Sequence, residues 1–341
     1  MRKITKIELA LLDNLVWVLV AVFFIINSIW TPNFFSGLNL KNILYQSSIL
    51  GLLVLGQGIV CMVGELDMSL DGVLPFAPCM VVLLWDSLGG NLNPVVMLLL
   101  TLVVGGTIGL VNGLCVAKFG MNSFLMTMAM EIMLRGFVQF AIPFSITGLP
   151  KVYSFIGKGT IGTVQSAIVV FILMFVVFEL IFRFTVFGRK FILTGGNRRA
   201  AFISGIRTQW VIISAFIIAG VLASISGLIA AGRQEAVSNT MGKDLVMMSF
   251  AGAILGGGSF EGGKGKPVGM LGGALLLGMI DNSLTLLGVY VSLVYATKGL
   301  LIFAAIMLDR VRVKLRDAVM RRENIRKLAS ASTPPATGSA A

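Results

Sequence analysis

Apolar residues along this chain come in blocks that are separated by short polar breaks. Blocks of about 17 to 25 residues have the length of a helix that crosses the hydrocarbon core of a bilayer. The eighth block is short and rich in glycine, which favours a broken or re-entrant helix whose backbone is covered by protein or lines a cavity. The pattern therefore predicts an all-α polytopic membrane protein with about ten transmembrane helices. The candidate spans are residues 10–30, 43–63, 70–85, 94–117, 122–142, 165–183, 209–230, 245–258, 267–288 and 290–308.

Composition supports the membrane assignment. Of the 341 residues, 57% are hydrophobic and 12% are charged, against roughly 45–50% and about 25% in soluble domains. So few charges cannot cover a surface that faces water. We expect a cytoplasmic N-terminal segment at 1–9, a transmembrane domain at 10–308, and a basic and then disordered cytoplasmic tail at 309–341. No small-residue cleavage site follows the first apolar run, so we expect it to be a retained span.

The distribution of basic residues orients the predicted spans. Ten spans place both termini on the same side of the membrane. If that side is the cytoplasm, 20 of the 27 Lys and Arg residues lie in cytoplasmic segments and 5 lie in outer segments, which is the bias of the positive-inside rule. The net charge of +12 therefore belongs to the flanks of spans, and we expect no nucleic-acid partner.

The usual catalytic and metal-binding residue types are scarce. The chain has no His, and its three Cys residues lie inside apolar blocks, where a thiol behaves as a small buried hydrophobe. An intramembrane enzyme would need a Ser with a base, a metal cluster or paired carboxylates in a span, and the sequence shows no such arrangement. We therefore predict no catalytic residues and no metal site.

Three carboxylates lie where the chain leaves the second predicted span and starts the third, at Glu65, Asp67 and Asp71. Asp67 or Ser69 could cap the helix that follows, since a side-chain oxygen at an N-cap satisfies free backbone amides. A role of the carboxylates in transport or in subunit contact is the other reading. The sequence leaves both open.

Glu131 and Arg135 are four residues apart in the fifth span, so they share one helix face and can neutralise each other. Ionisable side chains inside a membrane are costly, which makes the pair a functional candidate. We favour a structural lock between helices.

The longest basic internal link runs from Gly188 to Arg207. Asn197 followed by Arg-Arg-Ala-Ala predicts a capped short helix that ends at Gly205. Such a helix suits docking to a partner better than a simple topology anchor. A later stretch, 258–264, has the spacing of a phosphate-binding loop, but Gly265 stands where Ser or Thr would hold Mg²⁺, so we expect a flexible turn there.

Glycines spaced four apart predict close packing between helices, since small residues on one face let backbones approach. The three rows are Gly105-Gly109-Gly113, Gly252-Gly256 and Gly269-Gly273.

Several of these stretches, in this order, resemble the permease subunits of bacterial ATP-binding cassette importers for monosaccharides, of the ribose, xylose and autoinducer-2 type. They are spread over about three quarters of the chain. The matching stretches are 55–72, 109–118, 188–206, 251–265 and 278–288.

The resemblance implies a subunit of a larger assembly in the bacterial cytoplasmic (inner) membrane. Its expected partners are a second permease subunit, identical or not, an extracytoplasmic sugar-binding protein and a cytoplasmic ATP-binding subunit. ATP would bind and be hydrolysed on that separate subunit, and no cofactor would bind this chain. The segment at about 188–206 would couple to the ATPase. Its candidate coupling residues are Gly195, Gly196, Asn197, Ala200, Ala201 and Gly205.

The chain departs from the family pattern in two places. Family members tend to read Gly-Gly-Ile-Asp-Leu-Ser-Val-Gly-Ser where this chain has 63–71, so Glu65 and Asp71 add two negative charges. A usual Pro-Pro or Pro-Ala after the fourth span is replaced by Met121-Asn122-Ser123. The first departure bears on the identity of the substrate, and the second on the loop or the pathway.

Two classes of transporter remain. In the importer, hydrogen-bonding side chains facing a cavity would select a neutral polyol, and our candidates are Gln57, Asn112, Glu131 and Asn282. The alternative is an ion-coupled secondary transporter, for which Glu131 and Asp281 would be the protonatable residues. The basic link at 188–206 favours the importer, because it has no evident purpose without a docking partner.

Overall fold

The computed structural model describes residues 14–290 and 292–304, together with positions 307, 311, 314, 315, 318, 319 and 321. The predicted N-terminal segment 1–9 and most of the predicted tail 309–341 lie outside the described residues. The helices are α2 (Leu15–Trp30), α3 (Gly37–Met62), α4 (Leu70–Ser87), α5 (Pro94–Ala117), α6 (Ser123–Ala141), α7 (Lys151–Lys158), α8 (Ser166–Phe184), α9 (Val186–Gly196), α10 (Arg198–Ile203), α11 (Thr208–Gln234), α12 (Leu245–Leu255) and α13 (Pro267–Leu286). Four two-residue strands complete the elements, β1 (Ile146–Thr147), β2 (Thr160–Ile161), β3 (Val164–Gln165) and β4 (Ala236–Val237).

Among the described residues, seven helices are long and apolar enough to cross a membrane, namely α3, α4, α5, α6, α8, α11 and α13. This confirms an α-helical, multi-pass membrane protein. Three more apolar helices, α2, α12 and Ser292–Ala304, are shorter, so the number ten stays a prediction. The 11 residues of α12 reach about 16 Å along a core of about 30 Å, which confirms that the eighth block is short.

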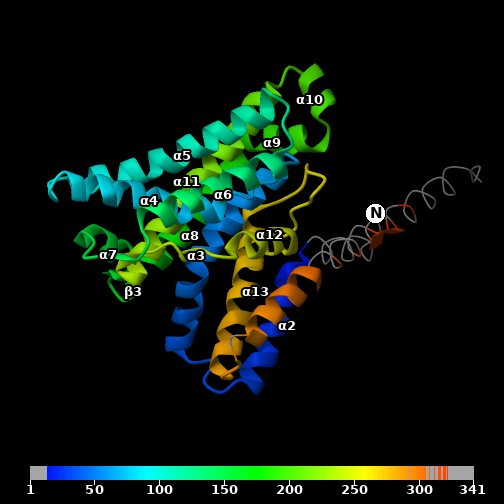
Figure 1. Ribbon diagram of the computed structural model, residues 1–341. Coiled ribbons are helices and arrows are strands. Elements are labelled where there is room, and N and C mark those ends of the chain that lie inside the picture. Colours follow the sequence, from blue (N-terminus) through cyan, green and yellow to red (C-terminus); the bar gives the residue numbers. More distant parts are fainter. Residues whose placement is uncertain are drawn as a thin grey trace, which may run out of the picture.

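Helices α3 and α11 form the centre of the molecule (Figure 1). Helix α11 packs on α3, α4 and α5, and α3 packs on α11, α12 and α13. The predicted glycine rows make these contacts close. A Cβ at Gly109 would lie 2.2 Å from the carbonyl oxygen of Phe216 on α11, and one at Gly273 would lie 2.0 Å from that of Gly252 on α12. The glycines therefore permit backbone contacts that any side chain would prevent.

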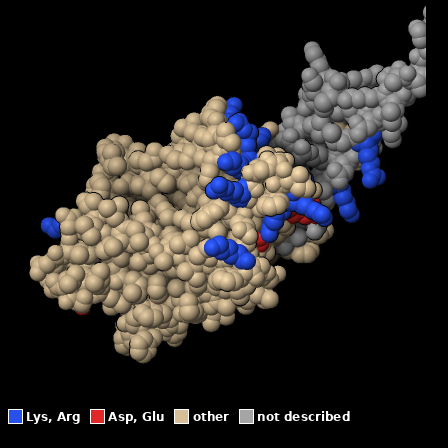
Figure 2. Space-filling view, turned by 90° about the horizontal axis from the view of Figure 1, so that it is seen from above, with Lys and Arg blue, Asp and Glu red and all other residues tan. Residues whose placement is uncertain are grey.

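The connecting segments gather at two ends of the helix bundle. At one end, α7 packs on α8 and α11, β1 pairs with β4, and Lys158 lies 3.0 Å from Glu235. At the other end lie α9, α10 and the glycine-rich turn 256–266, and Figure 1 shows α7 and α10 far apart. Seen from the α10 side, Lys and Arg gather in one region of the surface (Figure 2). The segments thus alternate between two ends, as successive spans require, although α7 itself was not predicted.

A short extended segment, residues 64–69, connects α3 to α4, and we call it the strap. Its backbone amides at Leu66 and Met68 donate hydrogen bonds to Ser123 Oγ (3.3 Å) and Thr127 Oγ1 (2.8 Å) of α6. The strap therefore runs along α6, and α4 begins with Gly72 against the backbone of Glu131, in the middle of α6.

Of the two readings that the sequence left open for the carboxylates before α4, the side-chain cap is not found in the structure. Ser69 is the N-cap residue, but its side chain makes no capping bond. Its hydroxyl instead donates to the carboxylate of Asp67 (2.6 Å), which also accepts from the Ser69 amide (2.9 Å). The local geometry is a closed turn within the strap, because two polar residues two positions apart satisfy each other before the helix begins.

The departure at Met121-Asn122-Ser123 has a local structural role. Asn122 caps α6 by accepting the Leu125 amide (3.1 Å), and Ser123 accepts the strap amide of Leu66. The polar pair therefore starts α6 and fastens the strap to it.

Candidate functional site

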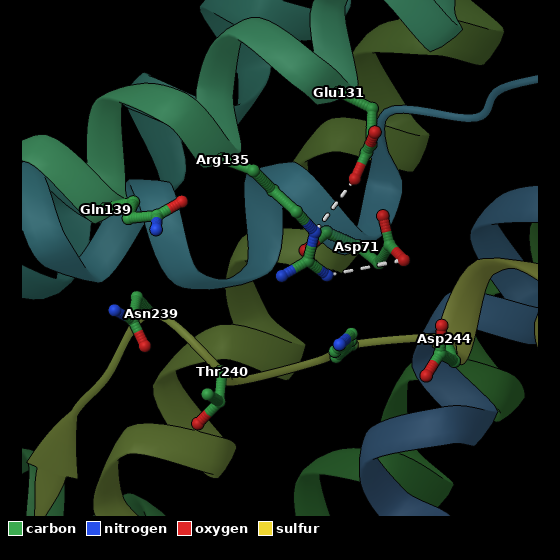
Figure 3. Close-up of a pocket in the computed structure, with 8 residues that line it drawn as sticks. Asp71, Glu131, Arg135, Gln139, Asn239, Thr240 and Asp244 are labelled. Atoms are coloured by element: carbon green, nitrogen blue, oxygen red, sulfur yellow. Dashed lines mark hydrogen bonds and ion pairs between the residues drawn. The ribbon is translucent and has the colours of Figure 1, made fainter.

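A polar cavity of about 360 Å³ opens between α4, α6 and the segment that leads into α12. Figure 3 shows its side chains converging from these elements. Three of them are carboxylates and two are cations, which is unusual for a wall built from apolar helices. The lining residues are Asp71, Glu131, Arg135, Gln139, Asn239, Thr240, Lys243 and Asp244.

Arg135 is the hub of the cavity. Its Nε donates to Glu131 Oε1 at 2.8 Å, and its Nη2 lies 3.3 Å from Asp71 Oδ2 (Figure 3). It also donates to the backbone carbonyl oxygens of Asp71 (3.1 Å) and Met241 (3.4 Å). The predicted Glu131–Arg135 pair is confirmed, and the guanidinium additionally joins α6 to α4 and to the segment before α12.

One carboxylate oxygen of Asp71, Oδ1, is left without a hydrogen bond among the described residues. The side chain is only 5% exposed. The backbone amide of Val246, in the first turn of α12, faces this carboxylate. Asp71 thus lies where the beginnings of α4 and α12 meet, at the wall of the cavity.

Of the four predicted pathway residues, only Glu131 lines this cavity. Gln57 is fully buried in α3, with its amide nitrogen 3.9 Å from Cys61 Sγ. Asn112 is buried in α5 and donates to Ser69 Oγ at 2.9 Å. Asn282, in α13, exchanges hydrogen bonds with Asn39 at 3.0 Å in each direction. The structure does not bring these four together, and their assignment to a pathway stays a prediction.

Asp281, the second candidate for ion coupling, lies apart from the cavity. Its Oδ2 is 3.4 Å from Lys298 Nζ, so this carboxylate has its own cation on the neighbouring helix Ser292–Ala304.

Sequence reasoning missed most of the cavity wall. Asp71 and Arg135 were singled out, but for other reasons, and no pattern pointed to Gln139 or to the segment 239–244. That segment has only ordinary loop residues in sequence, and its meaning comes from its position opposite α6.

Asp67, between the spans, is buried without a cation beside it. Burial raises the pKa of its carboxyl to about 6, although the two hydrogen bonds from Ser69 act in the opposite direction. Its Oδ2 has no hydrogen-bond partner among the described residues. The strap thus holds a carboxyl that takes up a proton in mildly acidic solution.

A second site lies at the end that carries α9 and α10. As predicted, Asn197 caps a short helix, and its side chain accepts the amide of Ala200 at 2.9 Å. Gly205 follows that helix in the left-handed conformation, with φ of +82° and no atom near its missing side chain. Ala201 is buried and Ala200 is exposed, so only part of this helix is free to meet a partner.

Two large apolar side chains at the end of α10 project from the molecule. Phe202 is 69% exposed and Ile203 is 76% exposed. Basic residues precede and follow them in the sequence, and Figure 2 shows Lys and Arg gathered on the face of the molecule seen from above. An apolar tip within a basic rim has the character of a protein-docking surface. The basic residues of α9, α10 and the link to α11 are Arg189, Lys190, Arg198, Arg199 and Arg207.

The base of this surface is fixed to the strap by glycines. A Cβ at Gly195 would lie 1.9 Å from the carbonyl oxygen of Met62, and the same oxygen accepts the Gly263 amide at 2.9 Å. Gly262 packs equally closely on Gly64 and Gly195. We call Gly64, Gly195, Gly262 and Gly263 the glycine junction.

Comparison with known proteins gives a consistent picture. Residues 39–308 match the family described as branched-chain amino acid transport system, permease component. The chain is 33% identical over 289 residues to the ribose import permease protein RbsC of Bacillus subtilis, covering 84% of this chain and 89% of that one. It is 30% identical over 313 residues to RbsC of Escherichia coli K12, covering 90% and 96%. The D-allose transport system permease protein AlsC of Escherichia coli K12 is 30% identical over 302 residues, covering 86% and 89%. No solved structure matches the chain.

Proposed function

This chain belongs to the family of transport-system permease components, and we propose that it is the membrane-spanning subunit of an ATP-binding cassette importer. Its solute would be a monosaccharide or a related small polyol, in keeping with the relatives named for ribose and D-allose. The relationship covers most of both chains, and it favours this function over an ion-coupled secondary transporter.

The observation that carries the proposal is the separation of two surfaces. A polar cavity lies among the spanning helices, and an exposed basic helix with an apolar tip lies at one end of the bundle. A secondary transporter needs the first but not the second. A subunit that is driven by a separate ATPase needs both.

The cavity is of suitable size and chemistry for such a solute. Small-molecule sites are typically about 300–1,000 Å³, and this one is about 360 Å³. Amide, hydroxyl and carboxylate groups from Gln139, Asn239, Thr240 and Glu131 line it. These groups offer both donors and acceptors, as recognition of hydroxyl groups requires.

The remaining parts of the assembly follow from this role. ATP would bind and be hydrolysed on a cytoplasmic subunit docked at α10, so this chain would be no enzyme and would hold no cofactor. A binding protein would deliver the solute at the opposite end, where α7 lies. A second permease subunit would complete the passage in the bacterial cytoplasmic membrane, with both termini of this chain in the cytoplasm.

The decisive experiment is solute-dependent ATP hydrolysis in proteoliposomes that contain this chain, its candidate ATPase and its binding protein. Loaded binding protein should stimulate hydrolysis and drive solute uptake. Gly205→Glu should uncouple the two, because it forces a charged side chain into a left-handed backbone position at the end of α10. Uptake that runs on a proton gradient without any ATPase would establish the secondary transporter instead.

A further inference from the structure

The two acidic residues by which this chain departs from the family pattern lie at one end of the strap and just past its other end, and each is paired with an arginine. Glu65 Oε1 lies 2.5 Å from Nη2 of Arg198, in the first turn of α10. Asp71, just past the other end, lies 3.3 Å from Arg135 in the cavity. One ion pair therefore joins the start of the strap to α10, and a second joins the residue just past its end to Arg135 at the cavity wall.

The strap between these pairs is held along its length. Leu66 and Met68 donate their amides to α6. Ser69 is tied to Asp67 by two bonds and accepts a third, at 2.9 Å, from the Asn112 side chain of α5. These bonds attach the strap to α5 and α6 along its length, so bending within the strap would break them.

Besides the ion pair of Glu65 with α10, backbone atoms join α9, which precedes α10, to the region where the strap begins. At the glycine junction, the backbone of α9 touches the end of α3 with no side chain between them. The Glu65 side chain is 12% exposed, whereas that of Arg198 is 50% exposed. An ion pair with one half-exposed partner adds little to stability. The pair matters here because of its position, which connects α10 to the strap.

We propose that Glu65 is a positioning residue that passes movement of α10 through the strap to Asp71 and Arg135 in the cavity. The inference rests on the proposed function, since it takes α10 as the part that an ATPase moves. It adds a specific route, with Arg198 as the receiving residue on the docking helix. Arg199, its exposed neighbour on α10, makes no ion pair with Glu65 and supplies a matched control.

The first test is charge reversal in the proteoliposome assay. Glu65→Arg and Arg198→Glu should each reduce the solute transported per ATP hydrolysed by about fivefold or more, the lower bound of a typical coupling between sites. The double reversal Glu65→Arg with Arg198→Glu should restore most of it, whereas Glu65→Arg with Arg199→Glu should restore none, because Arg199 makes no ion pair with Glu65. No rescue by the first double reversal, or equal rescue by both, would overturn the proposal.

The second test needs no ATPase, so it separates this inference from the proposed function. Asn239→Cys in a Cys115→Ser background places a thiol at the cavity wall, the other two native cysteines being buried. Its rate of modification by a water-soluble maleimide should change by about fivefold or more with Arg198→Glu and return with the double reversal. If the unsubstituted assembly shows no solute-stimulated hydrolysis, the importer assignment fails. If the assembly hydrolyses ATP in response to solute but the maleimide rate does not change with Arg198→Glu, the importer assignment stands and the route through Glu65 fails.

Discussion

Arg135 donates to the backbone carbonyl oxygen of Asp71 at 3.1 Å and lies 3.3 Å from its carboxylate. A single side chain on α6 therefore holds both the backbone and the charge of the first turn of α4. Because the same guanidinium also binds Glu131 and the carbonyl oxygen of Met241, the beginning of α4, the middle of α6 and the segment before α12 form one unit around the cavity.

This geometry predicts different effects of two substitutions at Arg135. Arg135→Ala leaves Glu131 and the buried Asp71 without their cation, and we expect a loss near the lower end of about 3–5 kcal/mol, since a buried ion pair loses its compensation. Arg135→Lys keeps the charge but cannot reach four acceptors from one planar group, so its loss should be intermediate. The apparent melting temperature of the purified chain in detergent measures both.

Asp71→Asn is the control for this series. It removes one carboxylate and keeps the Glu131–Arg135 pair, so its melting temperature should stay closer to that of the unsubstituted chain than Arg135→Ala. A larger loss from Asp71→Asn than from Arg135→Ala would show that Asp71, rather than Arg135, organises the cavity.

Adjacent glycines at the end of α9 predict opposite outcomes. A Cβ at Gly195 meets the carbonyl oxygen of Met62 at 1.9 Å and the Gly263 nitrogen at 2.5 Å, both of them backbone atoms. Gly195→Ala should therefore cost about 1–3 kcal/mol through overpacking and reduce ATP-driven uptake. At Gly196 the nearest atom is 3.9 Å away, so Gly196→Ala should be tolerated. Membrane abundance, melting temperature and uptake of the two variants give the comparison, and equal behaviour would contradict the close contact.

The sides of the membrane can be read with single cysteines. Ser204, which follows α10, and Asn91, between α4 and α5, are both exposed and lie at opposite ends of the predicted topology. In intact cells, a membrane-impermeant maleimide should label Asn91→Cys and not Ser204→Cys. In inside-out vesicles the pattern should reverse. Labelling of both positions from the same side would refute the predicted orientation.

Docking at the tip of α10 is open to a direct test. Phe202 and Ile203 are exposed and make no part of the core. Phe202→Asp and Ile203→Asp should therefore change the free energy of unfolding by no more than about 0.5 kcal/mol, as surface changes do. Copurification of the ATPase with the chain should fall in both variants. Undiminished copurification would place the docking surface elsewhere.

Asp67 predicts a dependence of stability on pH. Its pKa of about 6 in the folded chain exceeds the value of about 3.9 expected when unfolded, so the folded state binds the proton more tightly. The free energy of unfolding should therefore fall as pH rises from about 4 to about 6 and level off above that, by an amount on the order of 3 kcal/mol. Asp67→Asn should flatten this dependence, which melting curves across that pH range would reveal.

Local features of this chain could be predicted from its sequence. Hydropathy located each of the seven long apolar helices found among the described residues, because burial in lipid depends on composition over a single segment. The Asn197 cap and the Glu131–Arg135 pair were also correct, since each involves residues within one helical turn.

The cavity could not be predicted, for a physical reason. In a bilayer, both the protein core and the lipid are apolar, so the hydrophobic pattern does not tell which face of a helix turns inward. Gln57 and Asn282 were chosen from their positions on helices alone. They lie buried among packed helices, outside the cavity, and their assignment to a pathway stays a prediction. Glu65 and Arg198 are 133 positions apart, and nothing in either neighbourhood encodes their contact.

The shortness of α12 bears on how the protein is made. An apolar helix of 11 residues is too short to be inserted as an independent span, so it must enter the bilayer together with α13, against whose Gly273 its own Gly252 packs. The wall of the cavity that precedes α12 is then completed only after α13 has been synthesised. Until that point, α6 carries its guanidinium into the membrane already paired with Glu131 on the same helix, which lowers the cost of inserting a charge before its other partners arrive.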